Sequence, residues 1–242
     1  MTSNATASPV PRVDVVIPVY NEEEALPGSI ATLYTFLTEH CPYDWRIVIA
    51  DNASTDSTWT QAQALAARYP RVVPFHLDQK GRGRALRQAW TASDADVVSY
   101  MDVDLSTGLD AFMPMIDAII KDGYEIAIGS RLLPQSRVTR GLKRELISRC
   151  YNLLIKLLFW HHFSDAQCGF KAVSRRVVRE LLPLVQDQAW FFDSELLLLA
   201  ERHGYRIKDI PVTWVDDPGS TVNIVDTAWK DFKGLVRVRF SR

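Results

Sequence analysis

The stretch DVVSYMDVD, residues 96–104, joins a short, mostly apolar run to two carboxylates that are separated by one valine. The run itself, residues 97–101, is bounded by acidic residues and is typical of a strand that is buried on both faces. Ligands of an open parallel sheet gather at the carboxyl ends of its strands. The stretch therefore predicts a buried strand with a polar site directly after it.

The same pattern recurs on both sides of this stretch. Short apolar runs predict four more strands, at residues 13–18, 45–50, 72–77 and 124–129. Apolar residues at helical spacing predict helices between them, at residues 26–37, 59–69, 84–92 and 109–121. Repeated strand–helix units predict an α/β fold, with a mostly parallel sheet and helices on both faces.

Beyond residue 129 the chain becomes basic. Residues 131–149 hold six Lys or Arg and one Glu, and six minus one gives a local charge of +5. We expect a helix at residues 146–163, a strand at 169–173 and two further helices at 175–184 and 194–203. An extended segment is expected at 205–215 and a basic amphipathic helix at 225–240. Asp193 is the expected N-cap of the helix at 194–203, and Gly204 is its expected C′ residue.

The composition fits one large globular domain. The chain has 242 residues, of which 47% are apolar and 24% are charged, and its 28 basic and 29 acidic residues give a net charge of −1. So small a net charge excludes nucleic-acid binding through bulk positive charge. We expect a disordered tail at residues 1–12, a folded domain at residues 13–222 and a basic amphipathic helix at residues 223–242.

The cysteines and the N-terminus bear on the compartment. Cys41, Cys150 and Cys168 are odd in number and far apart, which predicts a reduced, cytosolic protein and no cysteine metal site. The first twelve residues lack the apolar core of a signal peptide. No apolar stretch approaches the roughly 18 to 20 residues that a transmembrane helix needs.

Asp102 and Asp104 carry the strongest chemical signal. Side chains at i and i+2 of a strand point to opposite faces, but at a strand end, where the backbone turns, both can reach one cation. Carboxylate oxygens suit Mg²⁺ or Mn²⁺ that bridges a diphosphate. The alternative is a solvated turn, which Ser106, Thr107 and Gly108 would favour.

Other predicted strands also end in polar residues. The first leads into PVYNEE at residues 18–23, the second into DNASTD at residues 51–56 and the third into QKGRG at residues 79–83. An aligned set of polar strand ends predicts a pocket for a nucleotide. The alternatives are helix capping by residues 54–56 and an ordinary loop at Gly81 and Gly83.

These motifs together resemble the family 2 glycosyltransferases, which have the GT-A fold, from about residue 13 to residue 240. More narrowly, DAQCGFK at residues 165–171 and WFFDSEL at residues 190–196 are similar to the polyprenyl-phosphate (dolichyl-phosphate) glycosyltransferases. DLST at residues 104–107 and DAQCGFK favour the glucosyl type over the mannosyl type.

The resemblance implies roles for individual residues. The base and ribose would be lined by Pro18, Tyr20, Glu22 and Asp51, and Lys80 would lie near the nucleotide. Asp102 and Asp104 would hold Mg²⁺ or Mn²⁺ on the diphosphate. Catalysis is assigned to Asp104, Asp165 and Arg131, and the acceptor phosphate to Arg131, Arg140, Lys143 and Arg144. Thr221 stands where relatives carry Lys or Arg, which leaves one of the family's phosphate contacts without its base.

The implied reaction moves a sugar from a nucleotide-sugar donor to a polyprenyl phosphate. We expect UDP-glucose as the donor, with GDP-mannose next. A phosphate monoester has a second pKa of about 6, so the acceptor oxygen is already anionic near pH 7 and needs no strong general base. Asp165 is expected to orient the acceptor or the sugar hydroxyls. A single in-line displacement predicts inversion at the anomeric carbon.

Two segments are candidates for attachment to a membrane. Residues 142–163 are apolar with a basic start, and residues 229–242 place basic residues and aromatic residues on different helical faces. We therefore expect a cytoplasmic protein, peripheral on the inner face of the membrane. For residues 146–163 the alternative is a buried core helix, or a contact with a second copy or a membrane-protein partner.

Two other functions compete with sugar transfer. A sugar-nucleotide pyrophosphorylase has a similar sheet but needs a Gly-rich, basic loop after the first strand, where this chain has PVYNEEE. A catalytically weak adaptor that binds nucleotide-sugars is supported only by Thr221, and the intact pair Asp102 and Asp104 argues against it.

Overall fold

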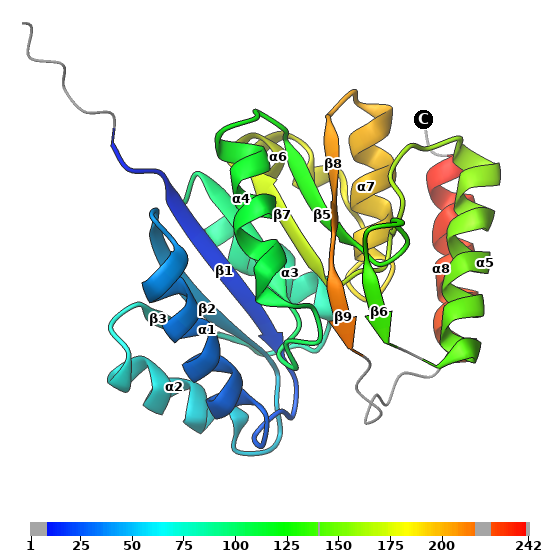
Figure 1. Cartoon of the computed structure of the whole chain (residues 1–242). Helices are drawn as coiled ribbons and strands as arrows, with labels where there is room; N and C mark the ends of the chain where they lie inside the picture. The colour runs from blue at the N-terminus through cyan, green and yellow to red at the C-terminus, as the bar shows by residue number, and fades with distance from the viewer. Residues whose placement is uncertain (1–8, 140, 216–223, 241–242) are drawn as a thin grey trace, which may run out of the picture.

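A seven-stranded sheet lies at the centre of the molecule (Figure 1). In this computed structural model the described residues are 9–139, 141–215 and 224–240. The strands of the sheet are β1 (Arg12–Val19), β2 (Asp44–Asn52), β3 (Val72–Leu77), β4 (Val97–Met101), β5 (Ile126–Ser130), β7 (Phe170–Ser174) and β8 (Ile207–Pro211). Their order is β3-β2-β1-β4-β7-β5-β8, and only the pairs that include β7 are antiparallel. The predicted mostly parallel sheet is confirmed.

Helices cover both faces of the sheet because its strands are apolar on both faces. One face packs against α1 (Leu26–His40), α2 (Thr58–Arg68) and α4 (Phe112–Ile120). The other face packs against α3 (Arg82–Ala92), α6 (Arg175–Glu180) and α7 (Phe192–Arg202). Outside this second layer, α5 (Leu142–Phe159) and α8 (Ile224–Phe240) lie side by side at the right of Figure 1, and Ile155 and Leu235 join them to the core.

The strand register brings the predicted site residues to one edge. Val19 of β1 is opposite Asp51 of β2, and Asp51 is opposite His76 of β3. Tyr100, near the end of β4, is opposite Val16 of β1. The loops that follow these four parallel strands therefore leave the sheet at the same edge, as the sequence pattern predicts.

Several boundaries differ from the predictions. β1 begins at Arg12, inside the segment that was expected to be a tail. The helix expected at residues 146–163 spans 142–159, because Trp160 adopts a left-handed backbone (φ 59°) and ends it. The helix expected at residues 175–184 divides into α6 and a short 3₁₀ turn, Leu182–Leu184, because Pro183 cannot donate the hydrogen bond that would continue it.

Two further details were not predicted correctly. The segment expected to be extended forms β8 and then β9 (Thr213–Val215), which pairs in parallel with β6 (Arg137–Thr139), a strand that the sequence pattern did not reveal. Asp193 is not an N-cap, because α7 begins at Phe192, two residues before the predicted start, and the Asp193 side chain is buried. Gly204 follows α7 with φ +75°, as expected of a C′ residue.

Helix α8 is fixed to the domain by close packing. A Cβ atom at Gly234 would overlap with the ring of Phe191, so a glycine is needed where α8 crosses α7. Asp231 of α8 is buried, and its Oδ1 has no hydrogen-bond partner among the described residues. Burial raises the pKa of Asp231 to about 6. Within the described part of the chain, no helix combines the length and the apolar character needed to cross a membrane.

The buried carboxyl of Asp231 predicts a specific pH dependence of stability. Its folded pKa lies above the unfolded value, so the native state loses stability as pH rises through about 4 to 6. We expect Asp231→Asn to raise the free energy of unfolding by about 2 kcal/mol at pH 8 and to leave it nearly unchanged at pH 4. Urea unfolding at the two pH values measures this, with the exposed Asp122→Asn as the control. Equal effects of Asp231→Asn at both pH values would contradict the prediction.

Candidate functional site

The two predicted metal ligands lie directly after β4. Asp102 is half-buried, and its Oδ1 accepts a hydrogen bond of 2.6 Å from Nη2 of Arg82. A Cβ atom at Gly169 would overlap with the Asp102 carboxylate, so this glycine lets the carboxylate lie against the loop before β7. Asp104 is exposed, and its Oδ1 accepts the backbone N–H of Ser106 at 2.9 Å.

These residues fit a divalent cation whose shell the substrate completes. Within the described ranges no group of three His, Cys, Asp or Glu side chains could enclose an ion. Mg²⁺ is usually held by one or two carboxylates together with substrate phosphates and water, and a two-carboxylate site suits that mode. Asp102 and Asp104 would hold the ion, and their oxygens match the hard ligands that Mg²⁺ and Mn²⁺ prefer.

A buried ionic network lies beneath Asp102, and the sequence patterns did not reveal it. Arg82 bridges Asp102 and Asp193, with Nη1 donating to Asp193 Oδ2 at 2.9 Å. The hydroxyl of Tyr100 donates to Asp193 Oδ1 at 2.5 Å, and the fully buried Lys171 places its Nζ 3.3 Å from the same oxygen. Burial alone would raise the pKa of Asp193, but the positive charges of Lys171 and Arg82 hold it below its ordinary value. The network keeps Asp193 ionised and fixes the Asp102 carboxylate.

Arg131 and Asp165 form a second buried pair. Asp165 is 0% exposed, and it accepts hydrogen bonds from Nε of Arg131 at 2.7 Å and from Nη2 at 3.0 Å. The backbone N–H groups of Arg131 and Gln167 also donate to it. Burial alone would raise the pKa of Asp165, but the Arg131 guanidinium holds it below its ordinary value. Asp165 is therefore a fixed anchor for Arg131, whose guanidinium also lies over the ring of Trp214.

The two centres lie at the same edge of the sheet, because β7 is antiparallel to both β4 and β5. Asp102 follows β4, Arg131 follows β5, and the loop before β7 carries Asp165 and also Gly169, which lies against the Asp102 carboxylate. Acidic residues that suit a metal and a cation that suits phosphate thus meet at one edge of the sheet.

The predicted nucleotide side lies after β1, β2 and β3. Nζ of Lys80 lies 3.4 Å from the ring centroid of Tyr20. Asp51 is fully buried, and Nδ1 of His76 lies 2.6 Å from its Oδ2. Ser54 donates its backbone N–H to the other oxygen of Asp51 at 3.3 Å. His76 is a residue that the sequence patterns missed, although the alternation of β3 places it opposite Asp51.

The loops after β1 and β2 are joined to each other. Asn21 has a left-handed backbone (φ 55°), donates its N–H to Ser54 Oγ and accepts the N–H of Thr55. The backbone N–H of Glu22 donates to Oγ1 of Thr58, the first residue of α2. Pro18 is half-buried within β1. All four residues predicted to line the base and ribose therefore lie at or just before one edge. Pro18 and Asp51 are near the ends of β1 and β2, and Tyr20 and Glu22 are on the loop after β1, which is joined to the loop after β2.

The remaining predicted phosphate contacts are less fully described. Arg140 and Thr221 lie outside the described residues. Lys143 and Arg144 lie in the first turn of α5, and their side chains also fall outside the description.

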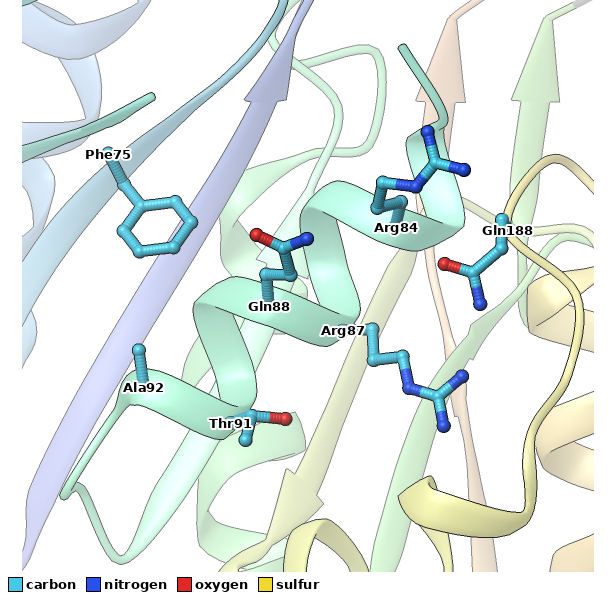
Figure 2. Close-up of a pocket in the computed structure, with 7 residues that line it drawn as sticks. All are labelled: Phe75, Arg84, Arg87, Gln88, Thr91, Ala92 and Gln188. Carbon is cyan, nitrogen blue, oxygen red and sulfur yellow. The ribbon is translucent and has the colours of Figure 1, made fainter. Parts of the chain in front are cut away.

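A separate hollow of about 510 Å³ runs along the outer side of α3 (Figure 2). Its two arginines are engaged, because Arg84 donates to the carbonyl of Lys80, and Arg87 donates to the carbonyls of Val185 and Pro183. These two arginines therefore hold neighbouring segments of the chain. Neither Asp102 nor Asp104 lines the hollow, so it is distinct from the two-carboxylate site.

Comparison with models of protein families shows to which family the chain belongs. The model of glycosyl transferase family 2 matches residues 14–182, more than half of the chain. The chain belongs to glycosyl transferase family 2. The matched region contains most of β1, all of β2 to β7, the pair Asp102 and Asp104, and the pair Arg131 and Asp165.

The regions of two relatives that align with this family 2 member make up different shares of each relative's length. Glycosyltransferase AglD of Haloferax volcanii is 35% identical over 223 residues, which are 91% of this chain but 36% of AglD. The dolichyl-phosphate beta-glucosyltransferase of Saccharomyces cerevisiae is 28% identical over 250 residues, 95% of this chain and 74% of that enzyme. The chain thus spans little more than a third of AglD.

Solved structures confirm the GT-A-like fold. Glucosyl-3-phosphoglycerate synthase from Mycobacterium tuberculosis in complex with UDP has a TM-score of 0.70 at 17% identity, covering 95% of this chain and 80% of that one. The same enzyme in complex with Mn²⁺ and UDP-glucose has a TM-score of 0.68 at 17% identity, covering 95% and 79%.

Proposed function

We propose that this family 2 member transfers glucose from UDP-glucose to a polyprenyl phosphate, with inversion, using Mg²⁺ or Mn²⁺. The observation that carries the proposal is that Asp102 and Asp104 lie at the same sheet edge as the buried pair Arg131 and Asp165. The carboxylates suit a metal–diphosphate, and the anchored guanidinium suits a second phosphate, that of the acceptor.

The chemistry follows from charge. A divalent ion held by Asp102 and Asp104 would neutralise the diphosphate as it leaves. The acceptor phosphate is anionic near neutral pH, so it requires orientation and a counter-charge more than a base. Arg131 supplies that charge in a fixed direction, and Asp165, whose oxygens are engaged by Arg131 and two backbone N–H groups, acts as its positioning residue.

The choice of donor and acceptor rests on relatives. The yeast relative is named a dolichyl-phosphate beta-glucosyltransferase, and a structural neighbour was solved with Mn²⁺ and UDP-glucose. These names favour UDP-glucose over GDP-mannose. Incubating the protein and Mn²⁺ with each labelled donor and a polyprenyl phosphate, then extracting the lipid, tests the choice. Label in the lipid from UDP-glucose supports the proposal, whereas label from GDP-mannose alone would contradict the donor.

A lipid acceptor requires contact with a membrane, and we propose that α5 and α8 provide it. Both helices leave large apolar side chains exposed, namely Leu146, Leu153, Leu157, Trp160, Trp229, Phe232, Val236 and Phe240. Lys230, Lys233 and Arg239 are exposed among those of α8 and suit anionic lipid at a cytoplasmic membrane face. Arg237, one of the basic residues within 229–242 that were expected to form this set, is not part of it, because Glu195 and Gln186 accept hydrogen bonds from its guanidinium.

Binding to vesicles tests this surface. We expect Trp229→Ser with Phe240→Ser to weaken co-sedimentation with vesicles that contain phosphatidylglycerol by about tenfold, because two large apolar side chains no longer enter the interface. A double variant of exposed apolar residues elsewhere, Val10→Ser with Leu184→Ser, should bind as the wild type does. If the protein instead forms dimers that only the first double variant disrupts, and binds no vesicle, the surface contacts a second copy.

A further inference from the structure

The loop at residues 186–190 is held closely against the start of α3. Gly83 and Arg84 donate their backbone N–H groups to the carbonyls of Ala189, at 3.2 Å, and Gln188, at 3.1 Å. A Cβ atom at Gly83 would overlap with Phe192 and crowd the backbone of this loop. Figure 2 shows the loop that carries Gln188 beside the first turn of α3, where Arg84 lies. Gly81 and Gly83 therefore allow a close contact between two backbones, which an ordinary loop would not require.

The same loop is also held from the opposite side. Glu195 of α7 is 3% exposed at its side chain, and its Oε2 accepts the backbone N–H of Asp187 at 2.7 Å. Arg237 of α8 donates to the same oxygen at 2.9 Å and to Gln186 Oε1 at 2.7 Å. Within the loop, Asp187 Oδ1 accepts the N–H of Ala189 at 2.7 Å. Contacts from α3, α7 and α8 thus give the loop a defined shape.

This rigid loop presents one large aromatic residue to solvent. Trp190 is 48% exposed, although residues 191–200, which follow it, are all buried. The guanidinium of Arg82 lies over its ring, 5.2 Å from the centroid, and the same guanidinium donates to Asp102 at 2.6 Å. The Arg82 side chain therefore connects the exposed indole to the Asp102 carboxylate, which would hold the metal–diphosphate.

We infer that Trp190 is the surface on which the hexose of the donor packs. The inference rests on the proposed use of a nucleotide-sugar. The hexose is bonded to the β-phosphate, so a diphosphate held at Asp102 and Asp104 brings the sugar to the neighbourhood of Arg82 and Trp190. The C–H groups of one sugar face carry partial positive charge and complement the negative face of an indole. A ring fixed in advance loses little conformational entropy when the sugar binds.

The test compares a nucleotide with its sugar conjugate on the full chain, without acceptor. Calorimetry with Mn²⁺ gives the Kd of UDP and UDP-glucose, and of GDP and GDP-mannose, for the wild type, Trp190→Ala and Trp190→Phe. For the pair that the wild type binds, we expect Trp190→Ala to raise the Kd of the sugar conjugate about tenfold and to change that of the free nucleotide by less than about twofold. Trp190→Phe keeps a flat ring and should recover most of the affinity. Leu184→Ala, another exposed apolar residue next to this loop, should change neither Kd.

Three outcomes would overturn the inference. If Trp190→Ala raises the Kd of the nucleotide and of the sugar conjugate equally, Trp190 only maintains the structure of the loop. If neither Kd changes, Trp190 does not contact the donor. Unchanged Kd values together with a raised KM of the polyprenyl phosphate, measured for Trp190→Ala in a separate transfer assay, would assign Trp190 to the acceptor. Failure of the proposed function has a different signature, because binding of the conjugate through Trp190 would persist while no sugar reaches the lipid phosphate.

Discussion

We expect Asp104→Asn to lower the rate of the proposed sugar transfer by about a thousandfold at saturating Mn²⁺ and to leave the protein as stable as the wild type. The loss follows from the position of Asp104 after β4, where its carboxylate would hold the ion that neutralises the leaving diphosphate. Stability is retained because Asp104 is exposed and its amide replacement keeps an oxygen to accept the Ser106 N–H. Initial rates of lipid labelling and thermal unfolding measure the two effects.

A matched control separates the loss of a metal ligand from the loss of a charge. Asp122→Asn also removes one exposed carboxylate, but Asp122 follows α4 at the opposite edge of the sheet from the two-carboxylate site. We expect it to transfer sugar at the wild-type rate, and chelation of divalent ions should reduce the wild type to the rate of Asp104→Asn. Wild-type activity in Asp104→Asn, or activity that chelation does not affect, would contradict the metal site.

We expect the second large effect from Arg131→Met, on stability as well as on activity. It leaves Asp165 buried at 0% exposure without its ion-pair partner, which costs about 3 to 5 kcal/mol of unfolding free energy. Activity falls by about a hundredfold or more, because the acceptor phosphate loses its fixed counter-charge. Urea unfolding and initial rates measure the two losses separately.

A double variant separates the loss of activity from the loss of stability. Arg131→Met with Asp165→Asn removes both buried charges and keeps a side-chain oxygen that can accept the backbone N–H groups of Arg131 and Gln167, so no buried charge is left without a partner. We expect the double variant to unfold at nearly the wild-type urea concentration while its transfer rate stays as low as that of Arg131→Met. Recovery of activity together with stability would show that Arg131 supports the fold and does not act on phosphate.

The edge of the sheet could be predicted because its signals are local. β4 is an apolar run of five buried residues followed directly by Asp102, and β1 and β2 end in polar residues in the same way. Parallel pairing then requires these ends to lie together, as the register shows. Arg131 and Asp165 were both singled out in the sequence, although their ion pair depends on a fold that joins positions 34 residues apart.

The network below the edge could not be predicted, because its partners are distant in the chain. Arg82 and Asp193 are separated by 111 positions, and the close approach of the starts of α3 and α7 depends on the absence of a side chain at Gly83. Asp193 precedes a clear helical pattern, which favoured an N-cap, but burial beside Lys171 gave it another role. The end of α5 was also hidden, since Trp160 adopts a left-handed backbone that is more typical of glycine or asparagine.

The acceptor provides the most direct test of the central claim. Purified protein, Mn²⁺ and labelled UDP-glucose are divided among a polyprenyl phosphate, the corresponding polyprenol and 3-phosphoglycerate, a compound that forms part of the name of a structural neighbour. We predict label in the lipid phosphate alone, because Arg131 requires a phosphate and the exposed faces of α5 and α8 suit a lipid. Label in phosphoglycerate but not in the lipid phosphate, or equal labelling of the polyprenol, would contradict the account.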